Sequence, residues 1–135
     1  MKETPPGGNE TILFVDDEAP IRQLGQAILT HHGYNVILAR DGNEAIEVFT
    51  NSKSGIDLVV LDLTMPLQSG WDVLKTLISM DAGVKVIISS GNHDTHRLDE
   101  FKKSAGNLEF VAKPYHPHDL TRTIRDLLDR KISKD

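Results

Sequence analysis

The stretch Ile-Asp-Leu-Val-Val-Leu-Asp, residues 56–62, decides the fold. All four residues between Asp57 and Asp62 are large and apolar, with no alternation of polar and apolar positions. A strand with one face in water alternates, whereas a continuous apolar run is typical of a strand that is covered on both faces. We therefore predict a buried strand at the middle of a parallel sheet, ending near Asp62.

Apolar runs alternate with amphipathic stretches on both sides of this strand. Four more short runs predict strands at residues 12–15, 35–39, 86–88 and 108–112. Helical spacing of apolar residues predicts five helices: one from about Pro20 to Gly33, one after Asp41, and three at residues 71–80, 95–104 and 119–131. This alternation predicts an α/β fold with a five-stranded parallel sheet.

The helix predicted at residues 95–104 is the weakest of the five. Only Leu98 and Phe101 are strong apolar anchors in it. A helix that buries little apolar surface opens more easily than its neighbours. We therefore expect this helix to be held least tightly, and it is a candidate switch element.

The length of the chain predicts a single domain. One domain typically takes about 100–200 residues, and the chain has 135. Residues 1–9 hold two prolines and two glycines without apolar periodicity, which predicts a flexible leader or linker. We place the folded domain at residues 10–131 and a C-terminal tail at residues 132–135.

Composition argues against several classes of function. The chain has no cysteine, so neither disulfides nor thiolate metal sites are available. A net charge of -5 argues against direct contact with nucleic acid, which requires clustered Lys and Arg. The apolar runs are far shorter than the ~20 residues of a membrane span, and the first residues do not resemble a secretory signal. We expect a soluble, cytoplasmic protein without membrane contact.

Polar side chains follow four of the five predicted strands. They are Asp16 and Asp17 after the first strand, Asp62 after the third, Ser89 and Ser90 after the fourth, and Lys113 after the fifth. Right-handed crossovers make the strands parallel, so their carboxyl ends share the edge where open α/β folds bind ligands. Any single acid here could merely cap the next helix. Chance is a poor explanation for all of these polar residues together, because Lys113 at the end of the fifth strand is also followed by proline.

These residue types favour chemistry with phosphate and a metal ion. Close carboxylates repel one another and need a cation at neutral pH. Mg²⁺ prefers oxygen ligands and is often bound by one or two carboxylates together with phosphate oxygens, whereas Ca²⁺ is less suited to such a pocket. Lys113 and the Ser90 hydroxyl can hold phosphoryl oxygens, and a carboxylate can accept a phosphoryl group. Asp62, alone on the central strand, is the best-placed acceptor, which leaves Asp16 and Asp17 to hold the metal.

The sequence resembles the CheY-like receiver domains of response regulators in two-component signal transduction. The resemblance covers about residues 10–131 and is carried by ILFVDDE (12–18), LVVLDLTMPLQSG (58–70), VIISSG (86–91) and FVAKPY (110–115). It implies a flavodoxin-like, doubly wound five-stranded parallel sheet with strand order 2-1-3-4-5 and five helices.

The resemblance implies a metal site and a phosphoacceptor. Asp62 would accept the phosphoryl group. Asp17 and Asp62 would bind Mg²⁺ directly, Asp16 would bind it largely through a water molecule, and the backbone carbonyl of Thr64 would complete the protein ligands.

The resemblance also implies residues that hold the phosphoryl group and transmit its arrival. Ser90 would be the switching hydroxyl, Gly91 would leave room beside the phosphoryl group, and Lys113 would contact its oxygens. The peptide bond before Pro114 would be cis. Phe110 would be the switching aromatic, although a ring simply packed in the last strand fits equally well.

A receiver domain is a phosphoacceptor in a phosphorelay rather than a conventional enzyme, although it promotes its own phosphorylation and dephosphorylation. The resemblance implies a histidine kinase or a histidine phosphotransfer domain as phosphodonor. It also implies an output surface of the helix at 95–104, the strand at 108–112 and the last helix. The recipient would be a downstream protein or a linked domain, and both a stand-alone regulator and a receiver within a hybrid histidine kinase stay open.

Two other functions deserve comparison. A phosphohydrolase of the haloacid-dehalogenase kind also uses a strand-end Asp with Mg²⁺, but it normally carries a second Asp where this chain has Thr64. A pseudo-receiver keeps the fold without phosphorylation, which the intact set of acids and Lys113 argues against. The six histidines offer no three-ligand metal site by spacing.

Overall fold

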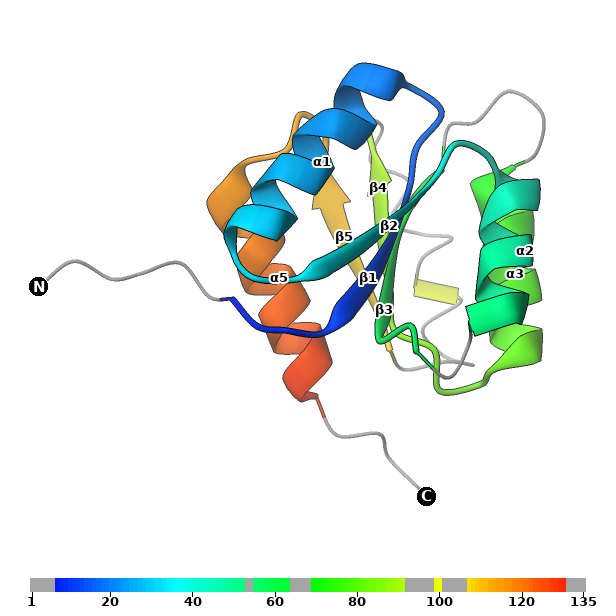
Figure 1. The fold of residues 1–135 in the computed structure, drawn as a ribbon. Coiled ribbons are helices and arrows are strands. Elements are labelled where there is room, and N and C mark those ends of the chain that lie inside the picture. The colour runs from blue at the N-terminus through cyan, green and yellow to red at the C-terminus, as the bar shows by residue number, and fades with distance from the viewer. Residues whose placement is uncertain (1–6, 53–54, 64–68, 92–98, 101–106, 131–135) are drawn as a thin grey trace, which may run out of the picture.

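The computed structural model describes residues 7–52, 55–63, 69–91, 99–100 and 107–130. Five strands and four helices lie in these ranges (Figure 1): β1 (Thr11–Val15), α1 (Ala19–His31), β2 (Asn35–Ala39), α2 (Gly42–Ser52), β3 (Leu58–Asp62), α3 (Gly70–Met80), β4 (Val86–Ser90), β5 (Leu108–Ala112) and α5 (Pro117–Asp129). Most of the helix predicted at residues 95–104 falls outside them. Asp99 and Glu100, which are described, are helical.

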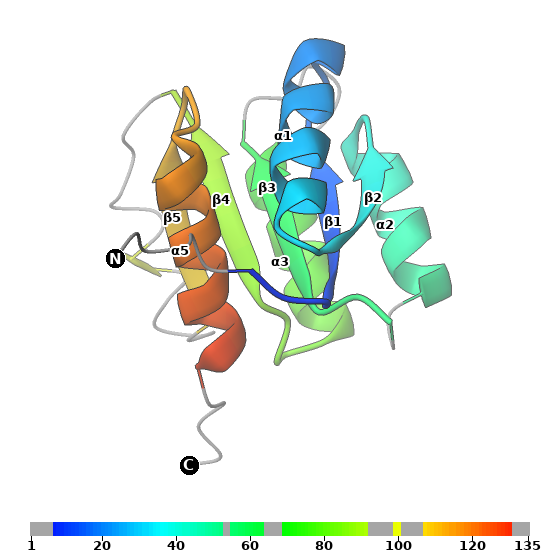
Figure 2. The same ribbon diagram turned by 60° about the vertical axis from the view of Figure 1, so that its left-hand side comes forward.

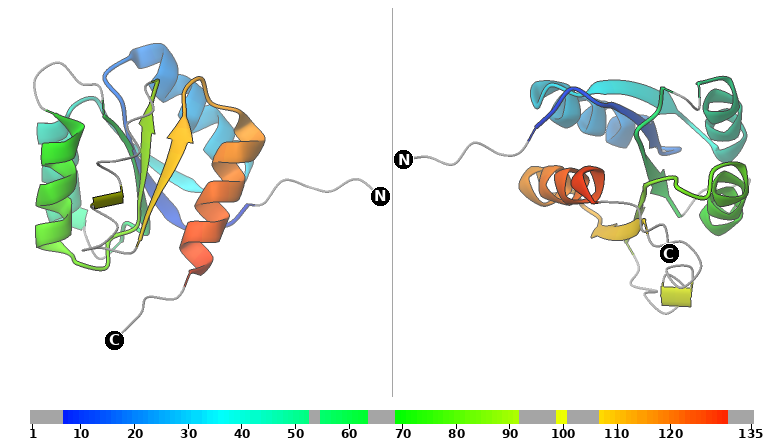
Figure 3. Two further views of the ribbon diagram at one scale, coloured as in Figure 1. Left: turned by 180° about the vertical axis from the view of Figure 1, so that it is seen from behind. Right: turned by 90° about the horizontal axis from the view of Figure 1, so that it is seen from below.

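The strands form one parallel sheet in the order β2-β1-β3-β4-β5. This arrangement confirms the predicted fold class and strand order. Helices α1 and α5 cover one face of the sheet, and α2 and α3 cover the other (Figures 2 and 3). The carboxyl ends of all five strands therefore share one edge of the sheet.

The central strand β3 contributes to two separate hydrophobic clusters. Leu58 and Val60 pack with the residues of α1 and α5, whereas Val59 and Leu61 pack with those of α2 and α3. All four side chains are fully buried. The continuous apolar run thus has the cause that the sequence suggested, because helices cover this strand on both faces.

At the amino edge of the sheet, Arg125 of α5 links this helix to the residues that precede β1. Its guanidinium donates to both carboxylate oxygens of Glu10, at 3.1 and 2.6 Å, and also bonds Asp129. The same group donates to the Gly7 carbonyl at 3.1 Å, and Gly8 donates its backbone N–H to His32. Residues 7 and 8 of the predicted leader therefore contact the folded domain.

Acid should weaken the contact between Glu10 and Arg125. The hydrogen bond from Arg125 lowers the pKa of Glu10 below its ordinary value of 4.5, despite the opposing effect of burial. The stability that this contact contributes is therefore present above pH 4.5 and is lost as the pH falls through the lowered pKa of the folded state. We expect Glu10→Gln to lower the free energy of unfolding by about 1 kcal/mol at pH 7 and by much less near pH 3.

Urea unfolding at both pH values measures this difference. Glu47→Gln, at an exposed position of α2, serves as the control and should change little at either pH. A loss in Glu10→Gln that is the same at both pH values would rule out the ionic origin of the effect.

None of the described helices combines the length and the apolar character that crossing a bilayer requires.

Candidate functional site

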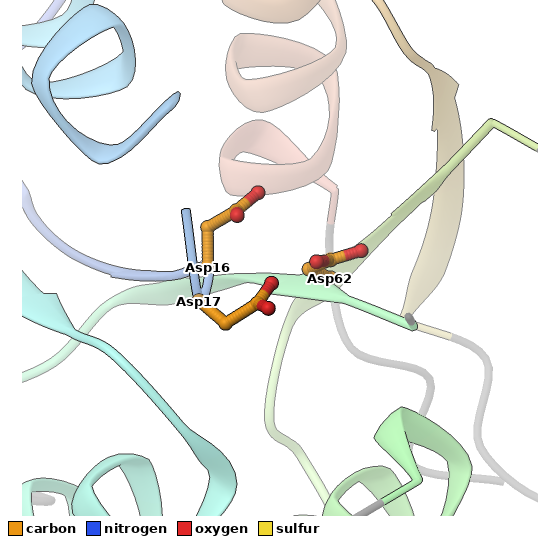
Figure 4. Close-up of side chains that lie close together, drawn as sticks. All are labelled: Asp16, Asp17 and Asp62. Atoms are coloured by element: carbon orange, nitrogen blue, oxygen red, sulfur yellow. The ribbon is translucent and has the colours of Figure 1, made fainter. Parts of the chain in front are cut away.

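Three acidic side chains meet at the carboxyl edge of the sheet. Asp16 directly follows β1 and Asp62 is the last residue of β3, and these two strands are neighbours in register, with Val15 opposite Leu61. One carboxylate oxygen from each of Asp16, Asp17 and Asp62 lies within 4.8 Å of the other two (Figure 4). The structure thus brings together three residues that the sequence singled out from two separate strand ends.

Lys113, directly after β5, provides the positive charge of this site. Its Nζ lies 2.8 Å from Asp16 Oδ2 and 3.3 Å from Asp62 Oδ2. Burial alone would lower the pKa of Lys113, but its hydrogen bond with Asp16 and the charges of Asp62 and Asp16 outweigh this effect and raise the pKa. Lys113 therefore remains an ammonium ion at neutral pH.

The balance of charge in the site fits a divalent metal ion. Among the described residues three carboxylates cluster here, and Lys113 pairs with two of them, Asp16 and Asp62, which are almost completely buried. The buried Oδ1 of Asp17 has no hydrogen-bonding partner among the described residues. A buried carboxylate oxygen in this position is costly unless a cation or a donor meets it. Oxygen donors of this kind are the ligands that Mg²⁺ prefers.

The turn between β1 and α1 is fixed by two hydrogen bonds to Asp16. The Arg22 guanidinium donates to the Asp16 backbone carbonyl at 2.7 Å, and the Glu18 backbone N–H donates to Asp16 Oδ1 at 2.9 Å. Both bonds restrain the short segment that carries Asp16 and Asp17. One Asp16 oxygen is thus occupied by the backbone, and the other faces Lys113.

Gly70, the first residue of α3, lies close to the backbone of Asp62 and Leu63. A Cβ atom at Gly70 would lie 2.7 Å from the Asp62 carbonyl oxygen and 2.5 Å from Leu63 Cα. Only glycine leaves room for this approach. Ser69 then caps α3 by accepting a hydrogen bond from the Trp71 N–H at 3.2 Å. The start of α3 therefore lies directly against the end of β3 that carries Asp62.

Residues 12–125 match the family model described as response regulator receiver domain. This chain belongs to that family. The receiver domain is 35% identical over 124 residues to chemotaxis protein CheY of Thermotoga maritima, and the match spans 91% of this chain and 97% of CheY. The resemblance to CheY-like receiver domains of two-component systems is thereby confirmed.

Two further relatives show how this domain occurs. The chain is 36% identical over 126 residues to a probable transcriptional regulator, ycf27, of Porphyridium aerugineum. The match covers 93% of this chain but only 50% of the regulator. Among solved structures, response regulator protein TrrA of Thermotoga maritima in complex with Mg²⁺-BeF is 31% identical, with a TM-score of 0.76, covering 87% of this chain and 98% of TrrA.

The structure also describes the residues that the resemblance assigns to phosphoryl binding and switching. Ser90 is buried at the end of β4, and its carbonyl accepts the Lys113 N–H at 3.1 Å. The peptide bond between Lys113 and Pro114 is cis, as the resemblance implied. A Cβ atom at Gly91 would meet no described atom within 4 Å, and Phe110 is partly buried against the α2 and α3 cluster. Their roles at a phosphoryl group stay predictions.

Three predicted positions lie outside the described residues: the metal ligand Thr64, which the resemblance implied, and the helix anchors Leu98 and Phe101. Conversely, the contacts of Arg22 and Gly70 were not predicted. The spacing of Arg22 from Asp16 carries a weak signal, because a residue in the second turn of the next helix can reach back to the preceding turn.

Proposed function

We propose that this receiver domain accepts a phosphoryl group from a phosphohistidine onto Asp62, with Mg²⁺ held by Asp16, Asp17, Asp62 and the Thr64 carbonyl. The observation that carries the proposal is the position of Asp62, which is 1% exposed and lies among two further carboxylates and the Lys113 ammonium. The complex of TrrA with Mg²⁺-BeF supports the metal in this proposal.

In the transfer step an Asp62 carboxylate oxygen forms a bond to phosphorus. The bond between phosphorus and the histidine nitrogen of the donor breaks, and its electron pair stays on that nitrogen. Lys113 offsets the negative charge on the phosphoryl oxygens, and the Ser90 hydroxyl donates to one of them. Bound Mg²⁺ would supply further charge neutralisation between the carboxylates and the phosphoryl group.

Phosphorylation would then change the surface that includes β5 and α5. A cavity of about 370 Å³ lies along this surface, and its lining includes Phe110, Lys113, Pro114, His116 and Arg122. Lys113 therefore borders both the acidic site and the cavity. We propose that movement of Ser90 and Lys113 toward the phosphoryl group shifts the equilibrium of this face and of the helix predicted at residues 95–104.

The proposed partners follow from this scheme. A histidine kinase or a histidine phosphotransfer domain would donate the phosphoryl group, and a downstream protein or a linked domain would read the changed face. Both arrangements fit the relatives, because this chain spans 97% of CheY and half of the ycf27 regulator.

Incubation with acetyl phosphate, with and without Mg²⁺, tests the proposal. We expect one phosphate per chain, released by hydroxylamine as expected for an acyl phosphate, and incorporated only with Mg²⁺. Continuous release of phosphate at a high rate would indicate a phosphohydrolase instead. Failure to incorporate phosphate in either condition would indicate a pseudo-receiver.

Binding of Mg²⁺ should also stabilise the fold. A ligand at 100 times its dissociation constant adds about 2.7 kcal/mol to the free energy of unfolding. We expect an increase of about this size with saturating MgCl₂, measured by urea unfolding at matched ionic strength. Asp17→Asn should lose most of the increase, whereas Asp72→Asn, at an exposed position of α3, should keep it. An equal increase in both variants would place the ion elsewhere.

A further inference from the structure

Two hydroxyl groups lie buried beside the acidic site and have no role in the function proposed above. The Tyr115 hydroxyl donates a hydrogen bond to Ser89 Oγ at 2.8 Å. Tyr115 is 7% exposed and Ser89 is 0% exposed. Burial raises the pKa of the Tyr115 phenol to about 12, so the hydroxyl stays protonated and remains a donor at neutral pH.

Ser89 is attached to the strand that carries the proposed phosphoacceptor. It lies opposite Asp62 in the ladder between β3 and β4. Its backbone carbonyl accepts the Leu63 N–H at 3.0 Å, and the carbonyl of the next residue, Ser90, accepts the Lys113 N–H at 3.1 Å. Ser89 therefore joins β3 through its backbone and Tyr115 through its side chain.

Tyr115 lies two residues after Lys113, on the segment that leads from β5 to α5. Its ring meets Phe14 of β1 edge-on, with ring centroids 5.8 Å apart and an interplanar angle of 64°. Tyr115 is thus held by β1 and β4 together. The segment that it anchors is the one from which Lys113 reaches both Asp16 and Asp62.

We propose that the hydrogen bond between Tyr115 and Ser89 positions Lys113 and Ser90 for phosphoryl transfer. It holds the segment after β5 against the end of β4, so that the ammonium and the Ser90 hydroxyl are already near Asp62 when the phosphoryl group arrives. Ser89 and Tyr115 are positioning residues, because they act through these two groups. The inference rests on the proposed function, which assigns Lys113 and Ser90 to the phosphoryl group.

The test combines stability and phosphorylation in Tyr115→Phe, Ser89→Ala and the double variant. Ser89→Ala leaves the buried Tyr115 hydroxyl without its acceptor and should lower stability most in urea unfolding. The double variant removes both hydroxyls and should regain most of that loss, because no buried donor is left unsatisfied. Phosphate uptake from acetyl phosphate with Mg²⁺ should nevertheless be about fivefold to tenfold slower in Tyr115→Phe and in the double variant alike.

Tyr34→Phe is the matched control. Tyr34 is also buried, at 3% exposure, but it precedes β2 at the opposite edge of the sheet, and its variant should take up phosphate like the wild type. A pair with only a structural role would regain its rate together with its stability. Wild-type uptake by the double variant or by Tyr115→Phe therefore overturns this inference alone. No uptake by the wild-type protein overturns the proposed function and the inference with it.

Discussion

Asp62→Asn should take up no phosphate from acetyl phosphate or from a phosphorylated histidine donor. The amide keeps the size of the side chain but lacks the nucleophilic carboxylate oxygen that would form the bond to phosphorus. The variant should fold, because it removes one of three clustered negative charges that repel one another and leaves Lys113 paired with Asp16 at 2.8 Å.

The measurement is the stoichiometry of hydroxylamine-sensitive phosphate, with urea unfolding as a check on the fold. Asp126→Asn, at an exposed position of α5, is the control and should incorporate phosphate like the wild type. Undiminished uptake by Asp62→Asn would mean that another side chain is the acceptor, and the proposed function would then be wrong.

Lys113→Met should be the most destabilising single change at the acidic site. Methionine fills a similar volume but leaves the buried carboxylates of Asp16 and Asp62 without their ammonium partner. Removing one partner from a buried ion pair typically costs about 3 kcal/mol or more. We expect a loss of about 3 kcal/mol in the absence of divalent metal, measured by urea unfolding in EDTA.

Mg²⁺ should restore much of this lost stability. The ammonium and the metal ion would neutralise the same carboxylates, so the site without Lys113 should bind Mg²⁺ more tightly and gain more stability from it than the wild type. Lys75→Met, at an exposed position of α3, is the control for the loss of a lysine and should change neither quantity. A Lys113→Met protein that is as stable as the wild type in EDTA would contradict this account of the charges.

The fold could be predicted from sequence where burial leaves a continuous apolar pattern. The residues of β3 predict a strand covered on both faces, and the alternation of apolar runs with amphipathic stretches predicts a parallel sheet. The strand order came from the family resemblance, because apolar patterns do not specify which strands are neighbours. The structure then placed β1 beside β3.

Element ends were less predictable than element centres. The fourth strand was predicted to end at residue 88 because its last apolar residue is there, whereas β4 continues to Ser90. Ser89 is a polar residue at a fully buried position, and its side chain accepts a hydrogen bond from Tyr115 on the segment between β5 and α5. Similarly, α5 begins at Pro117, two residues before the predicted start, since proline is well tolerated in a first turn.

The acidic site was predictable in its members and not in its connections. Asp16 and Lys113 follow strands and Asp62 ends one, and parallel topology brings such residues to one edge whatever their separation in sequence. The contact from Arg22 to the Asp16 carbonyl depends on how a long side chain folds back over a turn. The bond between Tyr115 and Ser89 depends on the path of a short segment. Neither leaves a repeating pattern in the sequence.

The side chains of β3 alternate between two helix layers, and this alternation affects how the proposed acceptor carboxylate is placed. Leu58 and Val60 face one helix layer, Val59 and Leu61 face the other, and Asp62 directly continues this strand. A cavity or an enlarged side chain in either layer would therefore shift or tilt β3. Because both helix layers pack on these four residues, the position of the Asp62 carboxylate depends on the packing on both faces of the sheet.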